Sequence, residues 1–248
     1  MRIIISGVNG RLGSAVAEGA AGKHQVAAGV DKVFDKQNPF PVYGSLAEVR
    51  EDADVIIDCS VHGAVRELLS HAGGKPVVIA ATGHDREEMD FIRDMAGRLP
   101  LFMAANLSLG INILMEMSAR IAGLIGGSFD IEIVEAHHNK KLDAPSGTAL
   151  AIAGGINKAL EAPRDFVYDR TSRRAARSAG EIGIHSVRGG TIVGEHEVIF
   201  AGADETLRLS HSAQSRNIYA EGALAAAAFL LKQPNGLYDM RSLLSDSL

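Results

Sequence analysis

One segment, residues 135–149, gathers side chains that could both transfer a proton and hold an anion. It reads Glu-Ala-His-His-Asn-Lys-Lys-Leu-Asp-Ala-Pro-Ser-Gly-Thr-Ala, so two histidines and two lysines are almost adjacent. Ser146 is a suitable N-cap, and Gly147 and Thr148 would then begin a helix whose free N–H groups attract anions. The pattern predicts a site that binds an anion and supplies a proton.

Other roles for these side chains remain open from the residues alone. His137 and His138 could ligate a metal ion, but no third ligand follows at zinc-like spacing, and zinc sites normally use three or four ligands. We therefore expect no metal. The two histidines could instead be structural residues at a strand end, and Lys140 and Lys141 could be solvated surface charges.

A second pattern, Gly7-Val8-Asn9-Gly10-Arg11-Leu12-Gly13, predicts a dinucleotide site. The first glycine permits a tight turn, the next lets the backbone approach a pyrophosphate, and Gly13 lets helix and strand pack closely. Asp31 ends the next apolar run, where a carboxylate can bind ribose hydroxyls. The alternative is an ordinary turn between a strand and a helix that binds nothing.

The choice between NADH and NADPH depends on two neighbouring residues. Asp31 favours NADH, whereas the adjacent Lys32 could accept the 2′-phosphate of NADPH, so the pair predicts that either nucleotide is used. Lys32 could also be an exposed charge without a ligand. Residues 80–84 and 104–108 follow two further apolar runs and are mostly small, which would allow a nicotinamide ring to lie against the backbone.

The first hundred residues alternate apolar runs with helix-like segments, which is typical of βαβ units on a parallel sheet. Several apolar runs lack polar alternation, as expected for strands that are covered on both faces. The expected strands are 2–6, 25–30, 55–59, 76–80 and 101–105, and the expected helices are 12–22, 46–51, 64–72 and 86–98.

The pattern changes after Asn106 and indicates a second, α+β domain with a mixed or antiparallel sheet. We expect a helix at 110–125 and strands at 129–136, 182–187, 191–200 and 206–212. Residues 172–178 contain three arginines and are interpreted as a mobile loop. The alanine-rich helix expected at 217–232 is so apolar that it needs a partner, and it would return to cover the first domain.

Bulk composition excludes several classes of protein. The 248 residues carry a net charge of −5, which does not favour a nucleic-acid partner or an anionic membrane. Cys59 is the single cysteine, so an intramolecular disulfide is excluded. The sequence shows no secretory signal and no run near the ~20 apolar residues of a membrane helix. We expect a cytoplasmic protein.

The stretch from Glu135 to Ala149 resembles the signature of the 4-hydroxy-tetrahydrodipicolinate reductase family, also called dihydrodipicolinate reductases. Further segments resemble that family in the family's order, and the resemblance runs from about residue 2 to residue 244. These segments are 7–13, 106–112, 194–196, 215–216 and 236–241.

The resemblance implies an α/β protein with a Rossmann-type dinucleotide-binding domain, residues 1–106 plus 217–248. An α+β domain with a mixed sheet, residues 107–216, would bind substrate and mediate a homotetramer. The implied reaction reduces a cyclic dicarboxylate, 4-hydroxy-tetrahydrodipicolinate, to tetrahydrodipicolinate with loss of water. It uses NADH or NADPH and belongs to diaminopimelate and lysine biosynthesis.

The resemblance also implies residue roles. His137 and Lys141 look like the catalytic pair, with Lys141 donating a proton as hydride reaches the ring. His138, Gly147, Thr148 and Arg216 look like contacts to the substrate carboxylates. The residues that look like cofactor contacts are Gly7, Gly10, Arg11, Leu12, Asp31, Lys32, Gly83, Ala105 and Leu107.

The chain departs from the family pattern beside the expected nicotinamide pocket. Leu107 and His84 stand where phenylalanine is common, and residues 60–63 lack the usual Pro-Glu pair, which puts cofactor affinity in question. Two alternatives to the family function are another Rossmann-type amino-acid dehydrogenase and a non-catalytic NAD(P) sensor. A sensor would be expected to have lost His137 or Lys141, and both are present.

Overall fold

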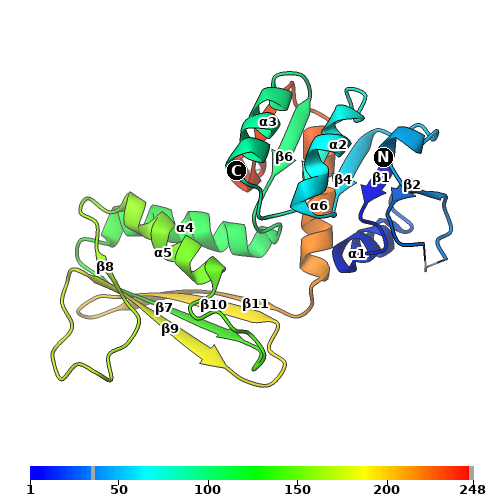
Figure 1. Ribbon diagram of the computed structural model, residues 1–248. Coiled ribbons are helices and arrows are strands. Elements are labelled where there is room, and N and C mark those ends of the chain that lie inside the picture. The colour runs from blue at the N-terminus through cyan, green and yellow to red at the C-terminus, as the bar shows by residue number, and fades with distance from the viewer. Residues whose placement is uncertain (35–36, 246–248) are drawn as a thin grey trace. The chain divides into compact units, whose positions relative to one another are not determined.

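The computed structural model describes residues 1–34 and 37–245 (Figure 1). The chain forms two compact units: Met1–Leu109 with Asn217–Leu248, here the first unit, and Gly110–Arg216, the second. Residues 246–248, which end the dinucleotide-binding domain expected from the sequence, lie outside the described residues. No helix among the described residues is long and apolar enough to cross a membrane.

The first unit is built on a seven-stranded sheet in the order β12-β6-β5-β4-β1-β2-β3. Every neighbouring pair is parallel. The strand order reverses between β1 and β4, the point at which ligands bind in such sheets. The predicted Rossmann-type class is confirmed. The strands are β1 (Arg2–Ser6), β2 (Gln25–Val30), β3 (Val42–Tyr43), β4 (Val55–Asp58), β5 (Val77–Ile79), β6 (Pro100–Met103) and β12 (Gly236–Tyr238).

Apolar clusters cover both faces of this sheet, which explains the unbroken apolar runs. Along β4, Val55 and Ile57 enter one cluster, with α1 (Arg11–Ala20), α6 (Asn217–Leu230) and α7 (Met240–Ser245). Ile56 enters the other, with α2 (Val65–Ser70) and α3 (Arg86–Ala96). Where a helix was predicted at 46–51, the chain makes only a 3-10 turn, Leu46–Glu48, capped by the Ser45 hydroxyl.

Helix α6 packs closely onto the first unit, as its alanine-rich sequence predicted. Ala220, Ala223 and Ala227 are buried in the cluster beside α1 and the sheet. Gly222 allows the closest approach, because a Cβ atom there would overlap the backbone carbonyl of Leu107. Because these side chains are small, the backbone of α6 can lie directly against the rest of the first unit.

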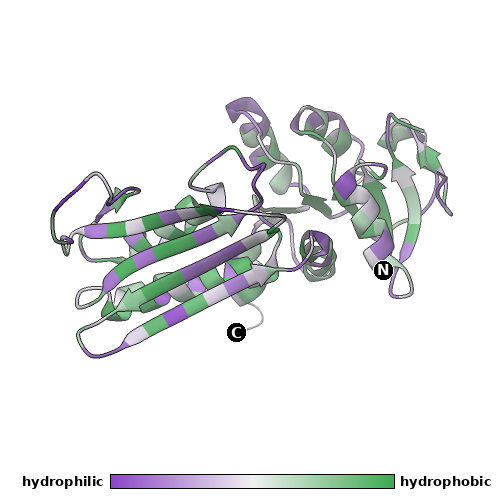
Figure 2. Ribbon diagram, turned by 90° about the horizontal axis from the view of Figure 1, so that it is seen from below, coloured by the Kyte–Doolittle hydropathy of each residue, from purple (hydrophilic) through white to green (hydrophobic). Residues whose placement is uncertain are grey.

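The second unit contains a five-stranded mixed sheet, β11-β10-β7-β9-β8, as expected from the sequence. Strand β7 (Asp130–His137) is parallel to β9 (Glu181–Arg188) and antiparallel to β10 (Gly194–Ala201). Strand β8 (Asp165–Val167) extends the sheet beside β9, and β11 (Thr206–Ala213) pairs with β10. Hydropathy alternates along these strands (Figure 2), so the sheet has one apolar face and one more polar face.

Helices α4 (Leu109–Ile125) and α5 (Gly147–Ala159) cover the apolar face of the second sheet (Figure 1). Ile131 and Ile133 of β7 pack there against Ile152 and Ile156 of α5. On the other face, the loop expected at 172–178 is present without regular structure. Its Arg177 is bound to the sheet, because the guanidinium donates to the side chains of Asp130 and Glu132.

The close contact at Gly222 yields a stability prediction. Gly222→Ala should lower the free energy of unfolding by about 3 kcal/mol, because the backbone of Leu107 cannot move aside cheaply. The control is Gly19→Ala in α1, whose new Cβ would lie 3.5 Å from the Leu224 side chain, an ordinary contact. Urea unfolding followed by circular dichroism measures both. Equal effects of the two substitutions would contradict the predicted overlap.

Candidate functional site

The segment that carries the predicted chemistry joins the end of β7 to the start of α5. Strand β7 ends at His137, and α5 begins at Gly147. The Ser146 hydroxyl accepts a hydrogen bond of 3.1 Å from the N–H of Ala149, which confirms it as the N-cap. Ser146 is buried and Gly147 is exposed, so α5 starts at the surface from an anchored cap.

Glu135 is the buried centre of this segment, and its side chain has no exposed surface. Its Oε1 accepts from Arg188 Nη2 at 2.7 Å and from the Ser146 N–H at 3.1 Å. Its Oε2 accepts from Arg188 Nη1 at 2.8 Å and lies 2.6 Å from His137 Nδ1. Burial alone would raise the pKa of Glu135, but hydrogen bonds from Arg188, Ser186, His137 and Ser146 lower it to about 2.

His137 is oriented by this carboxylate. A carboxylate only accepts, so Nδ1 of His137 carries the proton and donates it to Glu135. The ring packs edge-to-face against His196, with 5.3 Å between centroids. His196 Nε2 lies 3.2 Å from the Ser146 hydroxyl. Burial, followed by the nearby His137, lowers the pKa of His196 to about 4, so His196 is neutral at pH 7.

Lys141 lies in the loop between the two elements. Its Nζ pairs with Asp143 Oδ1 at 2.8 Å, and the backbone N–H of Lys141 donates to the backbone carbonyl of His138. The Arg188 guanidinium also holds this loop, because it donates to the Asp143 carbonyl at 2.8 Å. Lys141, His137 and His138 thus all lie in or beside the short connection between β7 and α5. Arg216 is exposed in the turn before α6, and no contact places it against this segment.

The nucleotide motif forms the turn between β1 and α1. Gly7 has a φ of +70°, and a Cβ there would lie 2.7 Å from the Cys59 carbonyl, so the turn accepts only glycine. A Cβ on Gly13 would overlap the Gly7 carbonyl, which confirms the predicted close packing of helix and strand. Gly10 is the N-cap of α1 and offers its helix N–H groups without a side-chain cap.

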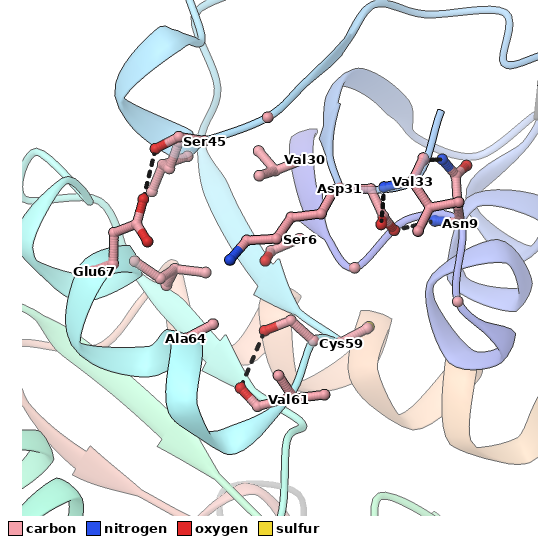
Figure 3. A pocket seen from close by; sticks show the side chains of 17 residues that line it. Ser6, Asn9, Val30, Asp31, Val33, Ser45, Cys59, Val61, Ala64 and Glu67 are labelled. Carbon is pink, nitrogen blue, oxygen red and sulfur yellow. Dashed lines mark hydrogen bonds between the residues drawn. The ribbon is translucent and has the colours of Figure 1, made fainter. Parts of the chain in front are cut away.

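A cavity of about 450 Å³ opens beside this turn (Figure 3). Asp31 lies at its edge, where its carboxylate accepts from the N–H groups of Asn9 (2.9 Å) and Val33 (3.0 Å). These bonds fasten the residues after β2 to the glycine turn and leave further acceptor capacity on the carboxylate. Gly7, Gly10, Asp31 and Lys32 all line the cavity. A glycine turn, an acid and a cation around one cavity fit a dinucleotide.

The remaining predicted cofactor residues lie elsewhere in the first unit. Arg11 and Leu12 begin α1, where Leu12 packs against the core, and neither lines the cavity. Gly83 follows β5 with a φ of +89°. Ala105 and Leu107 follow β6, and Leu107 is buried. The loops after adjacent strands therefore carry the residues expected near the nicotinamide.

Two of the residues that depart from the family pattern, His62 and His84, share one partner. His84 Nδ1 lies 3.3 Å from Glu88 Oε2, and His62 Nδ1 lies 3.5 Å from the same oxygen. Glu88 also accepts from the N–H of Asp85 in the capping box of α3. His62 and His84 thus tie the loop after β4 to the loop after β5. The sequence marked both positions as departures but did not identify Glu88 as their common partner.

Two family models match this chain. The model described as dihydrodipicolinate reductase, N-terminus, matches residues 1–107, and the model of the C-terminus matches residues 110–244. The chain belongs to the dihydrodipicolinate reductase family. A 4-hydroxy-tetrahydrodipicolinate reductase of Caldanaerobacter subterraneus subsp. tengcongensis is 51% identical, over 98% of each chain. One of Clostridium tetani is 38% identical, over 99% of this chain and 97% of that protein.

A solved structure agrees with this family. The dipicolinate-bound dihydrodipicolinate reductase of Paenisporosarcina sp. TG-14 has a TM-score of 0.80 and 25% identity, over 96% of this chain and 97% of that one. The family confirms the predicted NAD(P)H-dependent reductase activity in lysine and diaminopimelate biosynthesis, with NADH or NADPH as the cofactor. Nothing in these matches favours the dehydrogenase or sensor alternatives.

Sequence reasoning missed several residues around the segment. Glu135 had a usable signal, because it shares the buried phase of β7 with Ile131 and Ile133, and a buried carboxylate requires donors. No sequence signal could identify Arg188, because its contact with Glu135 depends on β9 lying beside β7. Among the described residues, no group of three or more His, Cys, Asp or Glu side chains could hold a metal ion.

The lowered pKa of His196 predicts how stability depends on pH. Unfolding returns the ring to its ordinary pKa of about 6.5, so the unfolded chain binds the proton first as pH falls. The free energy of unfolding should therefore drop by about 1–2 kcal/mol between pH 7 and pH 5 because of this group. His196→Asn should flatten that dependence in urea titrations. A slope that is unchanged in the variant would contradict the assignment.

Proposed function

We propose that the segment from Glu135 to Ala149 binds 4-hydroxy-tetrahydrodipicolinate and supplies the proton for its reduction. The observation that carries this proposal is the single connection that holds His137, His138 and Lys141 next to the accessible start of α5. Residues 107–216 would form the substrate-binding domain, and residues 1–106 with 217–248 the dinucleotide-binding domain. The dipicolinate in the related structure's title is likewise a cyclic dicarboxylate, which supports this class of substrate.

The start of α5 binds one substrate carboxylate. The N–H groups of Gly147 and Thr148 lie in the first turn of α5, and the N-terminal end of a helix attracts anions. His138 donates to the same carboxylate, and Arg216 contacts a carboxylate as well. Four donors on a dianion offset the protein's mildly acidic net charge of −5.

Lys141 donates the proton. Loss of the hydroxyl group and a ring proton as water converts the substrate to a conjugated imine. The nicotinamide nucleotide would supply the hydride that adds to this imine, and the addition leaves negative charge on the ring. A lysine ammonium beside that charge stabilises it and then neutralises it by proton transfer. Glu135 occupies Nδ1 of His137. His137 therefore acts with Lys141 through its other ring nitrogen, Nε2.

The first unit holds the nucleotide through three sets of residues. Gly7 and Gly10, with Arg11 and Leu12 at the start of α1, bind the pyrophosphate. Asp31 accepts from ribose hydroxyls, and Lys32 meets a 2′-phosphate when NADPH is bound. Gly83, Ala105 and Leu107 border the nicotinamide.

Assembly and setting complete the proposal. The chain forms a homotetramer in the cytoplasm, with no nucleic-acid or membrane partner. The face of the second sheet opposite α4 and α5 supports a subunit interface, because Val187 is 48% exposed there and Val134 and Ile199 share that face. Burying such a patch is favourable in an oligomer.

A coupled assay tests the reaction. The preceding synthase generates the substrate from pyruvate and aspartate semialdehyde, and nicotinamide absorbance follows oxidation of NADH or NADPH. We expect turnover with both nucleotides that depends on the synthase. Nucleotide binding without turnover would refute the proposal and favour the sensor alternative.

Alanine substitutions test the catalytic pair. Lys141→Ala and His137→Ala should each lower kcat by at least about 100-fold, because each removes a group that moves or holds a proton. Nucleotide affinity, measured by titration of NADH fluorescence, should be retained. The matched control is Lys140→Ala, which removes an exposed neighbouring ammonium and should leave kcat unchanged. A loss of nucleotide affinity in the folded Lys141 or His137 variants would contradict these roles.

Lys32 tests nucleotide selection. Lys32→Ala should raise KM for NADPH by about 10-fold, because a charge-assisted contact to phosphate is lost, and leave KM for NADH nearly unchanged. Lys32→Arg should restore the NADPH value. Equal increases in KM for both nucleotides would show that Lys32 shapes the cavity without recognising the phosphate.

A further inference from the structure

Arg188 is the residue that contacts both halves of the proposed catalytic segment. It lies at the end of β9, beside His137 in the strand register. Its guanidinium binds both carboxylate oxygens of Glu135, at 2.8 and 2.7 Å. The same group donates to the carbonyl of Asp143, at 2.8 Å, in the loop that carries Lys141. One planar side chain therefore links the end of β7 to the loop that follows it.

Glu135 is the second member of this arrangement. Arg188 and the Ser146 N–H donate to Oε1, Arg188 and His137 donate to Oε2, and the Ser186 hydroxyl also hydrogen-bonds to the carboxylate. Because Arg188 and the Ser146 N–H can only donate, both oxygens must be acceptors. The bond from Ser146 also connects the carboxylate to the first turn of α5.

We infer that Glu135 and Arg188 are positioning residues for the reduction, in that Glu135 fixes the His137 tautomer and Arg188 fixes the Lys141 loop. The inference rests on the proposed roles of His137 and Lys141. With Nδ1 donating to Glu135, the other ring nitrogen, Nε2, is the one that can exchange a proton with substrate. The Asp143 carbonyl held by Arg188 belongs to the residue whose carboxylate pairs with Lys141, so the ammonium has a defined starting position.

Glu135→Gln is the most informative substitution, because it keeps the shape and removes one acceptor. If its NH₂ group faces His137, the ring must accept at Nδ1 and move its proton to Nε2. The opposite orientation is disfavoured, because it would set the NH₂ against the N–H of Ser146, which cannot become an acceptor, whereas the His137 ring can. The substitution should therefore act through the His137 tautomer.

Strand β7 provides a matched control. Glu132 also binds arginines, Arg170 and Arg177, and lies 2.6 Å from a histidine nitrogen, His185 Nε2. Its side chain lies over Gly183 on the opposite face of the sheet, away from the segment. Glu132→Gln therefore breaks a similar network with no route to His137.

The test combines kinetics with ¹⁵N NMR of the imidazole of His137, assigned with His137→Gln. Glu135→Gln should lower kcat on the order of 100-fold, leave KM for the nucleotide within about twofold, and remove the preference for the Nδ1–H tautomer. Arg188→Lys, which cannot bind both oxygens and the carbonyl at once, should lower kcat less and retain the tautomer. Glu132→Gln should change neither readout.

Opposite results would overturn the inference. A folded Glu135→Gln protein with wild-type kcat and an unchanged Nδ1–H signal would show that the network is only structural. If Glu135→Gln fails to fold, Glu135→Asp keeps both acceptors but shortens their reach, and wild-type kcat with an unchanged tautomer there would be equally decisive. The NMR arm needs no turnover, so a failure of the proposed reaction would be seen separately, in the wild-type assay.

Discussion

A buried carboxylate is tolerated only while donors surround it, and Glu135 imposes that condition on the second unit. Its donors come from the end of β7, the end of β9 and the start of α5, so these three elements must meet at one point. The meeting point sets the orientation of His137, the first turn of the helix and, through Arg188, the loop of Lys141. Removing the carboxylate charge would take away the two charge-assisted hydrogen bonds that hold Arg188 at this point.

The two units supply complementary chemistry from different kinds of structure. In the first, a glycine turn brings backbone N–H groups to a cavity, and Asp31 fastens the end of β2 to that turn. In the second, side chains at a strand end and the start of a capped helix provide cations and donors. Backbone N–H groups suit the pyrophosphate of a dinucleotide, whereas side chains that can hold or release a proton suit the reaction itself.

The parts of this structure that could be predicted from sequence are those controlled by local pattern. Apolar runs identified the parallel sheet, alternation identified β7, and Ser146 identified the start of α5. Strands β3, β8 and β12 are too short for periodicity to reveal, and they exist because the sheet extends over them. The partnership of Glu135 with Arg188 joins residues 53 positions apart, so it depends on topology. The same holds for Arg177 with Glu132, and for His62 with Glu88, where loops after different strands meet.

A crystal structure of this chain with dipicolinate and a nicotinamide nucleotide would test whether residues 135–149 form the substrate site. We expect one carboxylate on the N–H groups of Gly147 and Thr148, with His138 beside it. Lys141 Nζ should lie within hydrogen-bond distance of the ligand, and His137 should still be bonded to Glu135. Dipicolinate bound away from the start of α5, or a Lys141 side chain that turns away from an otherwise occupied site, would contradict it.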